Sequence, residues 1–112
     1  MVLDHIALIV SREENIEFYK RFGFQEINRF IRSYDTVVFM ECDGIVLEIF
    51  VDPNHPERVG SPEPKGLRHV AFMVDKIENL DVEIEPIRID FFGRRFTFTK
   101  DPDGQPIELK EK

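Results

Sequence analysis

The sequence has 112 residues, a length that suits one compact domain and leaves little room for a second. With 42% hydrophobic and 33% charged residues, it has the composition of a globular protein rather than of a disordered chain. Its formal net charge of -7 argues against nucleic acid as a partner, because an acidic surface repels phosphate backbones.

Membrane and secreted classes are also disfavoured. No apolar stretch approaches the roughly 20 residues that a helix needs to span a bilayer, so no membrane partner is expected. The segment "MVLDHIALIV" carries Asp4 and lacks both a basic region and a small-residue cleavage site, so it does not match a signal peptide. Cys42 is the only cysteine, which rules out an internal disulfide and fits a reducing compartment. We therefore expect a cytoplasmic protein.

The first elements are a strand and a helix. Residues 2–10, "VLDHIALIV", predict a buried strand, because the run is short and apolar. Ser11 and Glu14 then form the S-x-x-E pattern of a capping box. Gly23 is placed to end the helix that follows. The segment "SREENIEFYKRFG" therefore predicts one helix of about three turns.

Three further strands complete the first half, "FQEINRFIR", "TVVFMEC" and "IVLEIFV". Asp43 and Gly44 separate the last two, and an Asp-Gly pair between β runs is a strong hairpin signal. Residues 1–52 therefore predict a βαβββ unit. The next stretch, residues 53–66, is rich in proline and predicts a loop.

The second half, residues 67–112, repeats the landmarks of the first. "LRHVAFMV" aligns with "LDHIALIV" at an offset of 64 residues, and "DGQPIEL" aligns with "DGIVLEI" at an offset of 60. Between them, "KIENLDVE" predicts a short, weak helix, and "EPIRIDFFGRRFTFT" predicts two strands around Gly93. Such a repeat means one supersecondary unit used twice. The predicted fold class is α+β, with two βαβββ units and a short second helix.

The repeat places a His in the first strand and a Glu in the last strand of each unit: His5, Glu48, His69 and Glu108. A carboxylate within an apolar run is unfavourable to bury unless it is compensated. The strand neighbours offer only Arg68 and Lys110 as cations. Two imidazoles and two carboxylates suit a divalent ion such as Ni, Zn, Co, Mn or Fe.

Each of the four residues also has a simpler interpretation when taken alone. A single His in a strand is most often a hydrogen-bonded residue, and a single Glu near a strand end usually points to solvent. Their matching frames favour a metal centre, since clusters of His and Glu build such sites. A repeat could also preserve the four residues by descent without a surviving metal.

The L-x-H-x-A-x-x-V openings, the D-G-x-x-x-E closings, the helix "NIEFYKRFGF" and the terminal "DPDGQPIEL" resemble the glyoxalase-like, or vicinal oxygen chelate, family over nearly the whole chain. The resemblance implies a single domain, residues 1–112, whose two units form an open, curved, mixed-sheet barrel around a metal site. It places His5, Glu48, His69 and Glu108 on the metal-ligand positions of lactoylglutathione lyase.

The same resemblance implies an activity. It implies a lyase or isomerase that moves a proton on a small oxygenated metabolite through a metal-stabilised enediolate. Glu108 would transfer the proton, with Glu48 as its counterpart. Two positions depart from the glutathione-using members: Ile9 stands where they carry Arg, and Asp52 where they often carry Asn. An acidic side chain would repel a glutathione carboxylate, so the match supports metal-dependent chemistry more than a glutathione substrate.

Other functions stay open on the same fold. An extradiol-type dioxygenase would need two His and one carboxylate on iron, whereas four candidate ligands are present. A non-catalytic binding protein for a small molecule or drug would need no metal. The family also forms dimers, so we expect a homodimer, in which the two units pair either within one chain or between two.

Several further polar residues carry weaker signals. His55 and the Asp101 turn are expected in loops, and Cys42 has no His near it in sequence to act as a base. Four arginines could bind an anionic substrate but, as isolated charges, are expected at the surface: Arg58, Arg88, Arg94 and Arg95.

Overall fold

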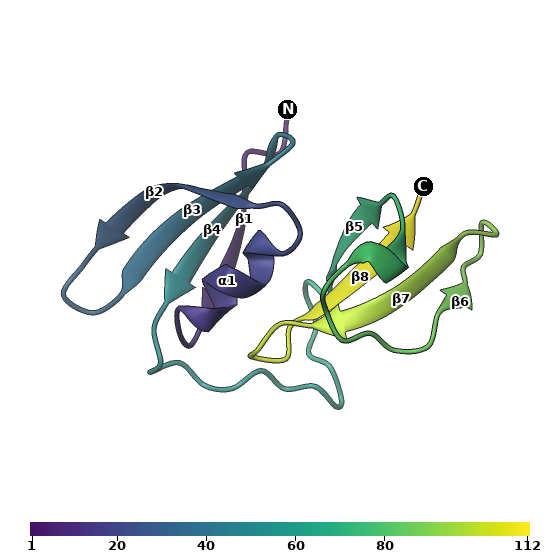
Figure 1. Ribbon diagram of the computed structural model, residues 1–112. Helices are drawn as coiled ribbons and strands as arrows, with labels where there is room; N and C mark the ends of the chain where they lie inside the picture. The colour runs from purple at the N-terminus through teal and green to yellow at the C-terminus, as the bar shows by residue number, and fades with distance from the viewer. The chain divides into compact units, whose positions relative to one another are not determined.

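Two four-stranded sheets, one in each half of the chain, form the framework of the computed structural model, which describes residues 1–112 (Figure 1). The chain divides into two compact units, Met1–Pro56 and Glu57–Lys112. Neither contains a helix with the length and apolar character that crossing a membrane requires. The α+β class and the repeat expected from the sequence are confirmed, since both sheets have the same mixed topology.

The first unit contains β1 (Ile6–Val10), α1 (Glu14–Lys20), β2 (Gln25–Ile31), β3 (Thr36–Cys42) and β4 (Ile45–Val51). The sheet order is β1-β4-β3-β2, with β1 parallel to β4 and the other pairs antiparallel. Strands β3 and β4 cover the predicted residues. The hairpin between them turns at Asp43 and Gly44, whose φ values of 48° and 83° give the left-handed pair that such turns require.

One face of this sheet supplies the core of the first unit. Residues at alternate positions of β3 and β4 have no exposed surface: Val38, Met40, Leu47 and Ile49. Helix α1 contributes Ile16 and Tyr19, which are also fully buried. Because successive strand residues point to opposite faces, the residues between these positions lie on the other face of the sheet.

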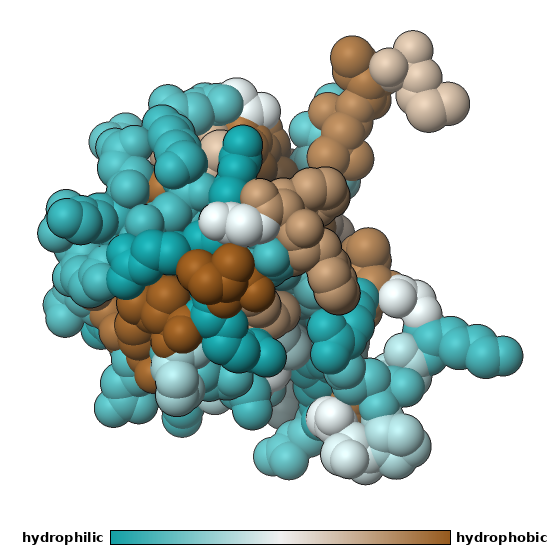
Figure 2. Space-filling model, turned by 90° about the vertical axis from the view of Figure 1, so that its right-hand side faces the viewer, coloured by the Kyte–Doolittle hydropathy of each residue, from teal (hydrophilic) through white to brown (hydrophobic).

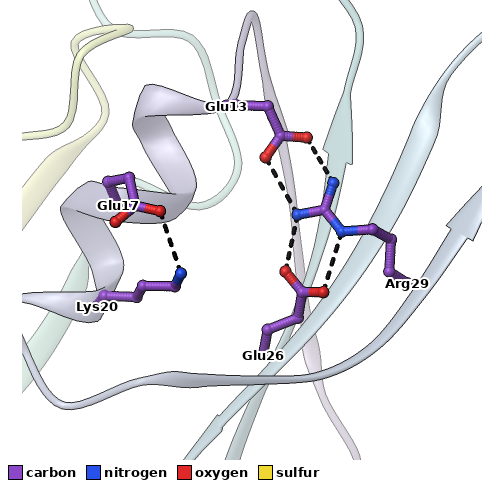
Figure 3. A network of polar contacts seen from close by, with 5 residues as sticks. All are labelled: Glu13, Glu17, Lys20, Glu26 and Arg29. Atoms are coloured by element: carbon purple, nitrogen blue, oxygen red, sulfur yellow. Dashed lines mark hydrogen bonds and ion pairs between the residues drawn. The ribbon is translucent and has the colours of Figure 1, made fainter.

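The first helix is shorter than expected. It has seven residues rather than three turns, and its N-cap residue is Glu13, not Ser11. The Glu13 carboxylate makes no capping bond; instead, Arg29 Nη1 and Nη2 donate to it over 2.6 and 3.1 Å (Figure 3). Arg29 also holds Glu26, so this cluster links the start of α1 to β2. The helix ends at Lys20 with Arg21 as its C-cap, earlier than predicted. Gly23, with a φ of +100°, closes the turn that follows and donates its N–H to the Lys20 carbonyl.

The first strand of each unit also begins later than predicted. The parallel ladder with β4 starts at Ile6, while Val2 and Leu3 are 92% and 79% exposed. His5 therefore lies immediately before β1, not within it. In the second unit, β5 starts at Val70, directly after His69.

The second unit contains β5 (Val70–Val74), the 3-10 turn η1 (Ile77–Asn79), β6 (Arg88–Ile89), β7 (Arg95–Lys100) and β8 (Pro106–Glu111). Its order, β5-β8-β7-β6, reproduces that of the first sheet, with β5 parallel to β8. The two strands predicted around Gly93 are β6 and β7. The expected second helix is reduced to the three residues of η1.

An irregular segment, residues 80–87, connects η1 to β6. The Thr97 hydroxyl donates to the Glu85 carbonyl over 2.7 Å, and the Thr99 hydroxyl donates to the Glu83 carbonyl over 2.6 Å. Both threonines are buried. Side-chain hydrogen bonds therefore satisfy backbone groups of a segment that has no helix or strand of its own.

Several large apolar side chains stay exposed. The edge strand β2 is exposed along its whole length and presents Phe30 and Ile31. In the second unit, Ile89, Phe91 and Phe92 are exposed around the β6–β7 turn. Figure 2 shows brown apolar groups at the surface between teal hydrophilic ones.

Candidate metal centre

The two glutamates lie on the sheet face opposite the core. In β4, Glu48 stands between Leu47 and Ile49, which are fully buried, and its own side chain is 20% exposed. In β8, Glu108 alternates in the same way and is 17% exposed. The apolar neighbours in sequence therefore belong to the core, and the carboxylates do not enter it. This corrects the expectation that both are buried among those neighbours.

Strand register brings each glutamate to a histidine. In the parallel ladders, Ala7 pairs with Glu48 and Ala71 pairs with Glu108. Each histidine lies two residues before its alanine. Because alternate residues share a face, the methyl group of alanine leaves space for the carboxylate to reach the imidazole. The same local arrangement occurs twice, as the repeat predicts.

The resulting distances are nearly equal in the two units. Nε2 of His5 lies 3.1 Å from Oε1 of Glu48, and Nε2 of His69 lies 3.2 Å from Oε1 of Glu108. Neither unit alone gathers three or more potential ligand side chains. The four predicted residues thus form two pairs, and their union in one ligand set stays a prediction.

The pairs fit a divalent ion. Metal–nitrogen and metal–oxygen bonds of about 2.1 Å at right angles place adjacent ligand atoms about 3.0 Å apart. The observed Nε2–Oε1 separations are close to that value. Imidazole nitrogen and carboxylate oxygen are also donors that Mn, Fe, Co, Ni and Zn accept. Each pair could therefore bind two neighbouring positions of one ion without rearranging.

The surroundings of the two histidines differ. His5 Nδ1 lies 2.7 Å from Asp4 Oδ2. That hydrogen bond, assisted by the charge of Glu48, raises the pKa of His5 above its ordinary value. A carboxylate on the second ring nitrogen is typical of histidines that bind metals. In contrast, His69 Nδ1 is buried without a hydrogen-bond partner, and the ring of Phe98 meets the His69 ring edge-on at 5.1 Å.

The cations that could have compensated the glutamates are paired elsewhere. Arg68 Nε donates to Glu63 over 2.9 Å, and Lys110 Nζ lies 2.8 Å from Asp90 Oδ2. Sequence reasoning did not single out Asp4 or Phe98. Asp4 could have been found from the sequence, because it directly precedes His5. The contact of Phe98 with His69 could not, because it depends on the pairing of β7 with β8.

Two other residues considered from the sequence, His55 and Cys42, have no role in the pairs. His55 lies 3.3 Å from Asp52 in the loop after β4, as expected for a loop histidine. The Cys42 thiol is partly buried, and this burial, with the nearby acidic groups, raises its pKa, which opposes a nucleophilic role.

The Asp101 turn forms as predicted. Asp101 Oδ1 accepts hydrogen bonds from the backbone N–H groups of Asp103 and Gln105. The carboxylate therefore fixes the turn that leads into β8 and, through it, the position of Glu108.

Comparison with known proteins places these features in context. A family model described as the Glyoxalase/Bleomycin resistance protein/Dioxygenase superfamily matches residues 2–109. The uncharacterized protein YwkD of Bacillus subtilis is 40% identical, and the match covers 98% of this chain and 96% of that protein. The crystal structure of a glyoxalase family protein from Enterococcus faecalis has a TM-score of 0.88 at 34% identity, covering 98% of this chain and 97% of that one.

A more distant structure carries a metal. A mutant of the fosfomycin resistance protein FosX from Listeria monocytogenes was solved in complex with Mn(II) and 1S,2S-dihydroxypropylphosphonic acid. It superposes with a TM-score of 0.73 at 24% identity, covering 97% of this chain and 90% of that one. At this identity the likeness is one of fold alone.

Proposed function

Because the chain belongs to the Glyoxalase/Bleomycin resistance protein/Dioxygenase superfamily, we propose that it is a divalent-metal-dependent lyase or isomerase acting on a small oxygenated metabolite. The observation that carries the proposal is the twofold His–Glu pairing in equivalent register. The proposed ligands are His5, Glu48, His69 and Glu108. The Mn(II) bound by FosX supports a divalent ion in general, and Ni, Zn, Co, Mn and Fe all suit the donors.

The chemistry divides between the ion and the chain. When bound, a divalent ion supplies a Lewis acid that favours removal of a proton from carbon next to a substrate oxygen. Glu108 accepts that proton as general base, and Glu48 is its counterpart for the opposite transfer. Phe98 meets the His69 ring edge-on and pairs with Glu108 across the β7–β8 ladder, so it covers one side of this pair.

The proposed substrate is not a glutathione adduct. Ile9 is 56% exposed and offers no charge to a carboxylate. Asp52 Oδ1 accepts the backbone N–H of Asn54, and Oδ2 pairs with His55, so the carboxylate is held within its loop. Neither position provides a cation for the two carboxylates of glutathione. We expect the methylglyoxal–glutathione adduct to turn over poorly or not at all.

Metal analysis tests the proposal directly. We expect the protein to bind one divalent ion per set of four ligands and to lose it to a chelator. Replacing Glu48 or Glu108 by Gln removes a ligand charge and should lower the metal affinity. Loss of a residue that only hydrogen-bonds to a ligand lowers metal affinity roughly 10- to 100-fold, and we expect a larger loss here. The measurement is elemental analysis after dialysis, followed by titration of the metal-free protein.

A matched control separates ligand loss from loss of charge. Glu57→Gln removes an exposed loop carboxylate and should leave the metal affinity unchanged. If wild-type protein takes up no divalent ion after reconstitution, the metal proposal is wrong. Ligand binding that a chelator does not affect would instead favour a non-catalytic binding protein.

We also propose that the protein acts as a homodimer in the cytoplasm. The shortened connection through η1 and the exposed apolar residues of β2 and the β6–β7 turn leave surface that a second copy would cover.

A further inference from the structure

The second unit contains a pocket of about 250 Å³. Residues before β5 form one wall. The rest comes from Glu85 ahead of β6, from β6 and β7, and from Gly104 and Pro106 where β8 begins. The residues that matter for its chemistry are Arg58, Glu63, Arg68, Arg88, Phe98 and Lys100. Because ligand pockets for drug-sized molecules begin at about 300 Å³, this volume suits a smaller metabolite.

The charges that line the pocket are unbalanced. Four cationic side chains face two carboxylates, Glu63 and Glu85. The Glu63 carboxylate is already paired with two arginines: Arg68 Nε donates to it over 2.9 Å and Arg58 Nη2 over 3.4 Å. Neither Arg88 nor Lys100 forms an ion pair. The guanidinium of Arg88 lies instead over the Phe96 ring, 4.9 Å from its centroid.

Arg58 adds a donor without an acceptor. Its side chain is 20% exposed, and Nη2 also donates to the Arg68 carbonyl over 3.0 Å. Its Nε is buried and has no hydrogen-bond partner. Buried donors are nearly always satisfied, so an unpaired N–H on an arginine that lines a pocket points to an acceptor supplied by a ligand. Oxygens of a carboxylate or phosphate are the usual acceptors for arginine.

The pocket adjoins the second His–Glu pair. Phe98 lines the pocket, pairs with Glu108 across the β7–β8 ladder, and places its ring edge-on to His69. Phe98 and Lys100 are two residues apart on β7 and therefore share one face of the sheet. Phe98 therefore contacts both the pocket and the His69–Glu108 pair.

From these observations we propose that the pocket binds an oxyanion, a carboxylate or a phosphate-type group, through Arg88 and Lys100 with Arg58 behind them. The pocket alone supports the anion site. Its assignment to the anionic group of the substrate, with the reacting carbons directed to Glu108, rests on the proposed function.

Titration of the metal-free protein with simple anions tests the pocket. Sodium phosphate and sodium acetate are added separately to ¹⁵N-labelled protein in the presence of a chelator, with sodium chloride at equal ionic strength as reference. We expect saturable shifts of the Phe98 and Lys100 amide signals with one or both anions and not with chloride. The anion that binds more tightly identifies the head group as phosphate-type or carboxylate.

Charge-removing variants make the test specific. Arg88→Gln and Lys100→Gln should each weaken the anion about tenfold, the order expected for one charge-assisted hydrogen bond. Arg94→Gln and Lys76→Gln remove the same charge outside the pocket and should leave the affinity unchanged. Amide spectra of each variant without ligand confirm that the fold is retained.

Two results would overturn the proposal. One is the absence of saturable shifts with either anion. The other is an equal loss of anion affinity in the pocket variants and the control variants. That result would show that anion binding depends only on the overall charge of the protein. The chelator keeps the protein free of metal throughout the anion titration, so this test does not depend on the metal. If the anion binds but the protein takes up no metal on reconstitution, the proposed metal chemistry is wrong and the anion site is still supported.

Discussion

At the scale of single residues, Asp90 illustrates how one carboxylate organises a turn. Its Oδ1 accepts the backbone N–H groups of Phe92 and Arg94 over 2.8 and 2.9 Å, and its Oδ2 lies 2.8 Å from Lys110 Nζ. Lys110 first, and then the backbone donors, lower the pKa of Asp90 from 3.8 to about 2. The ionised side chain therefore stabilises the folded protein more than the unfolded chain.

This shift predicts a defined pH dependence. With a folded pKa below the unfolded value, the contribution of Asp90 is fully present above about pH 4 and is lost as the pH falls through about 2. Asp90→Asn should lower the free energy of unfolding at neutral pH, and its difference from wild type should shrink between pH 4 and 2. Urea denaturation at several pH values measures both.

Asp75→Asn provides the comparison for this prediction, since Asp75 is 87% exposed and pairs with Lys112 at the surface. It should change stability little at any of these pH values. A wild-type advantage over Asp90→Asn that stays constant down to pH 2 would contradict the assignment.

The sequence identified the residues of the candidate site better than their surroundings. The repeat was sufficient to single out His5, Glu48, His69 and Glu108, because equivalent frames place equivalent side chains. It could not place Glu48 outside the core, since that depends on which sheet face is covered. Nor could it reveal that Phe98 contacts His69, because this contact requires two strand pairings far apart in sequence.

At the scale of elements, β7 holds the segment that replaces a second helix. Thr97 and Thr99 donate from buried positions to the carbonyls of Glu85 and Glu83. Removing either hydroxyl removes a partly buried hydrogen bond to the segment, at a cost of about 0.5–1.5 kcal/mol. Thr97→Val and Thr99→Val should each destabilise the protein by that order, measured by chemical denaturation.

Hydrogen exchange distinguishes this effect from general loss of packing. The two variants should also raise exchange rates in residues 80–87, because the tethers of this segment are lost. Thr36→Val, at the partly exposed start of β3, makes the same substitution without a comparable hydrogen bond and should alter stability by less than about 0.5 kcal/mol. Equal destabilisation by all three variants would show that valine itself, and not the lost bond, is responsible.

Elements with strong local signals were predicted well. Strands β3 and β4 have the predicted bounds because their apolar runs flank an Asp-Gly turn that fixes the hairpin. The weak helix predicted in the second half is only η1. The rest of this predicted helix is replaced by a segment that accepts tertiary hydrogen bonds from Thr97 and Thr99. No local sequence pattern predicts these bonds. The late start of β1 likewise depends on where its parallel partner begins to pair.

At the scale of the whole molecule, the division of the chain into two units bears on how copies of it assemble. Each unit has its own buried core and its own His–Glu pair, and residues 52–69 between them contain no helix or strand. Exchanging units between identical chains is a low-cost route to a dimer under these conditions. We therefore expect a homodimer in which each proposed ligand set takes one pair from each chain.

Mixing two variants that should each lose tight metal binding tests this arrangement. When Glu48→Gln and Glu108→Gln chains are unfolded together and refolded, half of the dimers contain one of each. In such a dimer one ligand set carries both substitutions and the other carries none. About a quarter of all sites should then bind metal with wild-type affinity. Sedimentation verifies the dimer, and metal titration counts the intact sites.

Each variant refolded alone serves as the control and should yield no tight site. Recovery of no tight sites from a mixture that sediments as a dimer would show that both pairs of a site come from one chain.

The hydrogen bond that His5 donates to Asp4 has a consequence for stereochemistry. The second unit has no counterpart, because Arg68 occupies the equivalent position and pairs with Glu63. Two carboxylates related by a repeat would treat the two sides of a flat, prochiral substrate alike if their surroundings were the same. With Asp4 beside one pair and Phe98 beside the other, the surroundings differ. If the proposed function holds, we therefore expect proton delivery to favour one side and to form a single enantiomer.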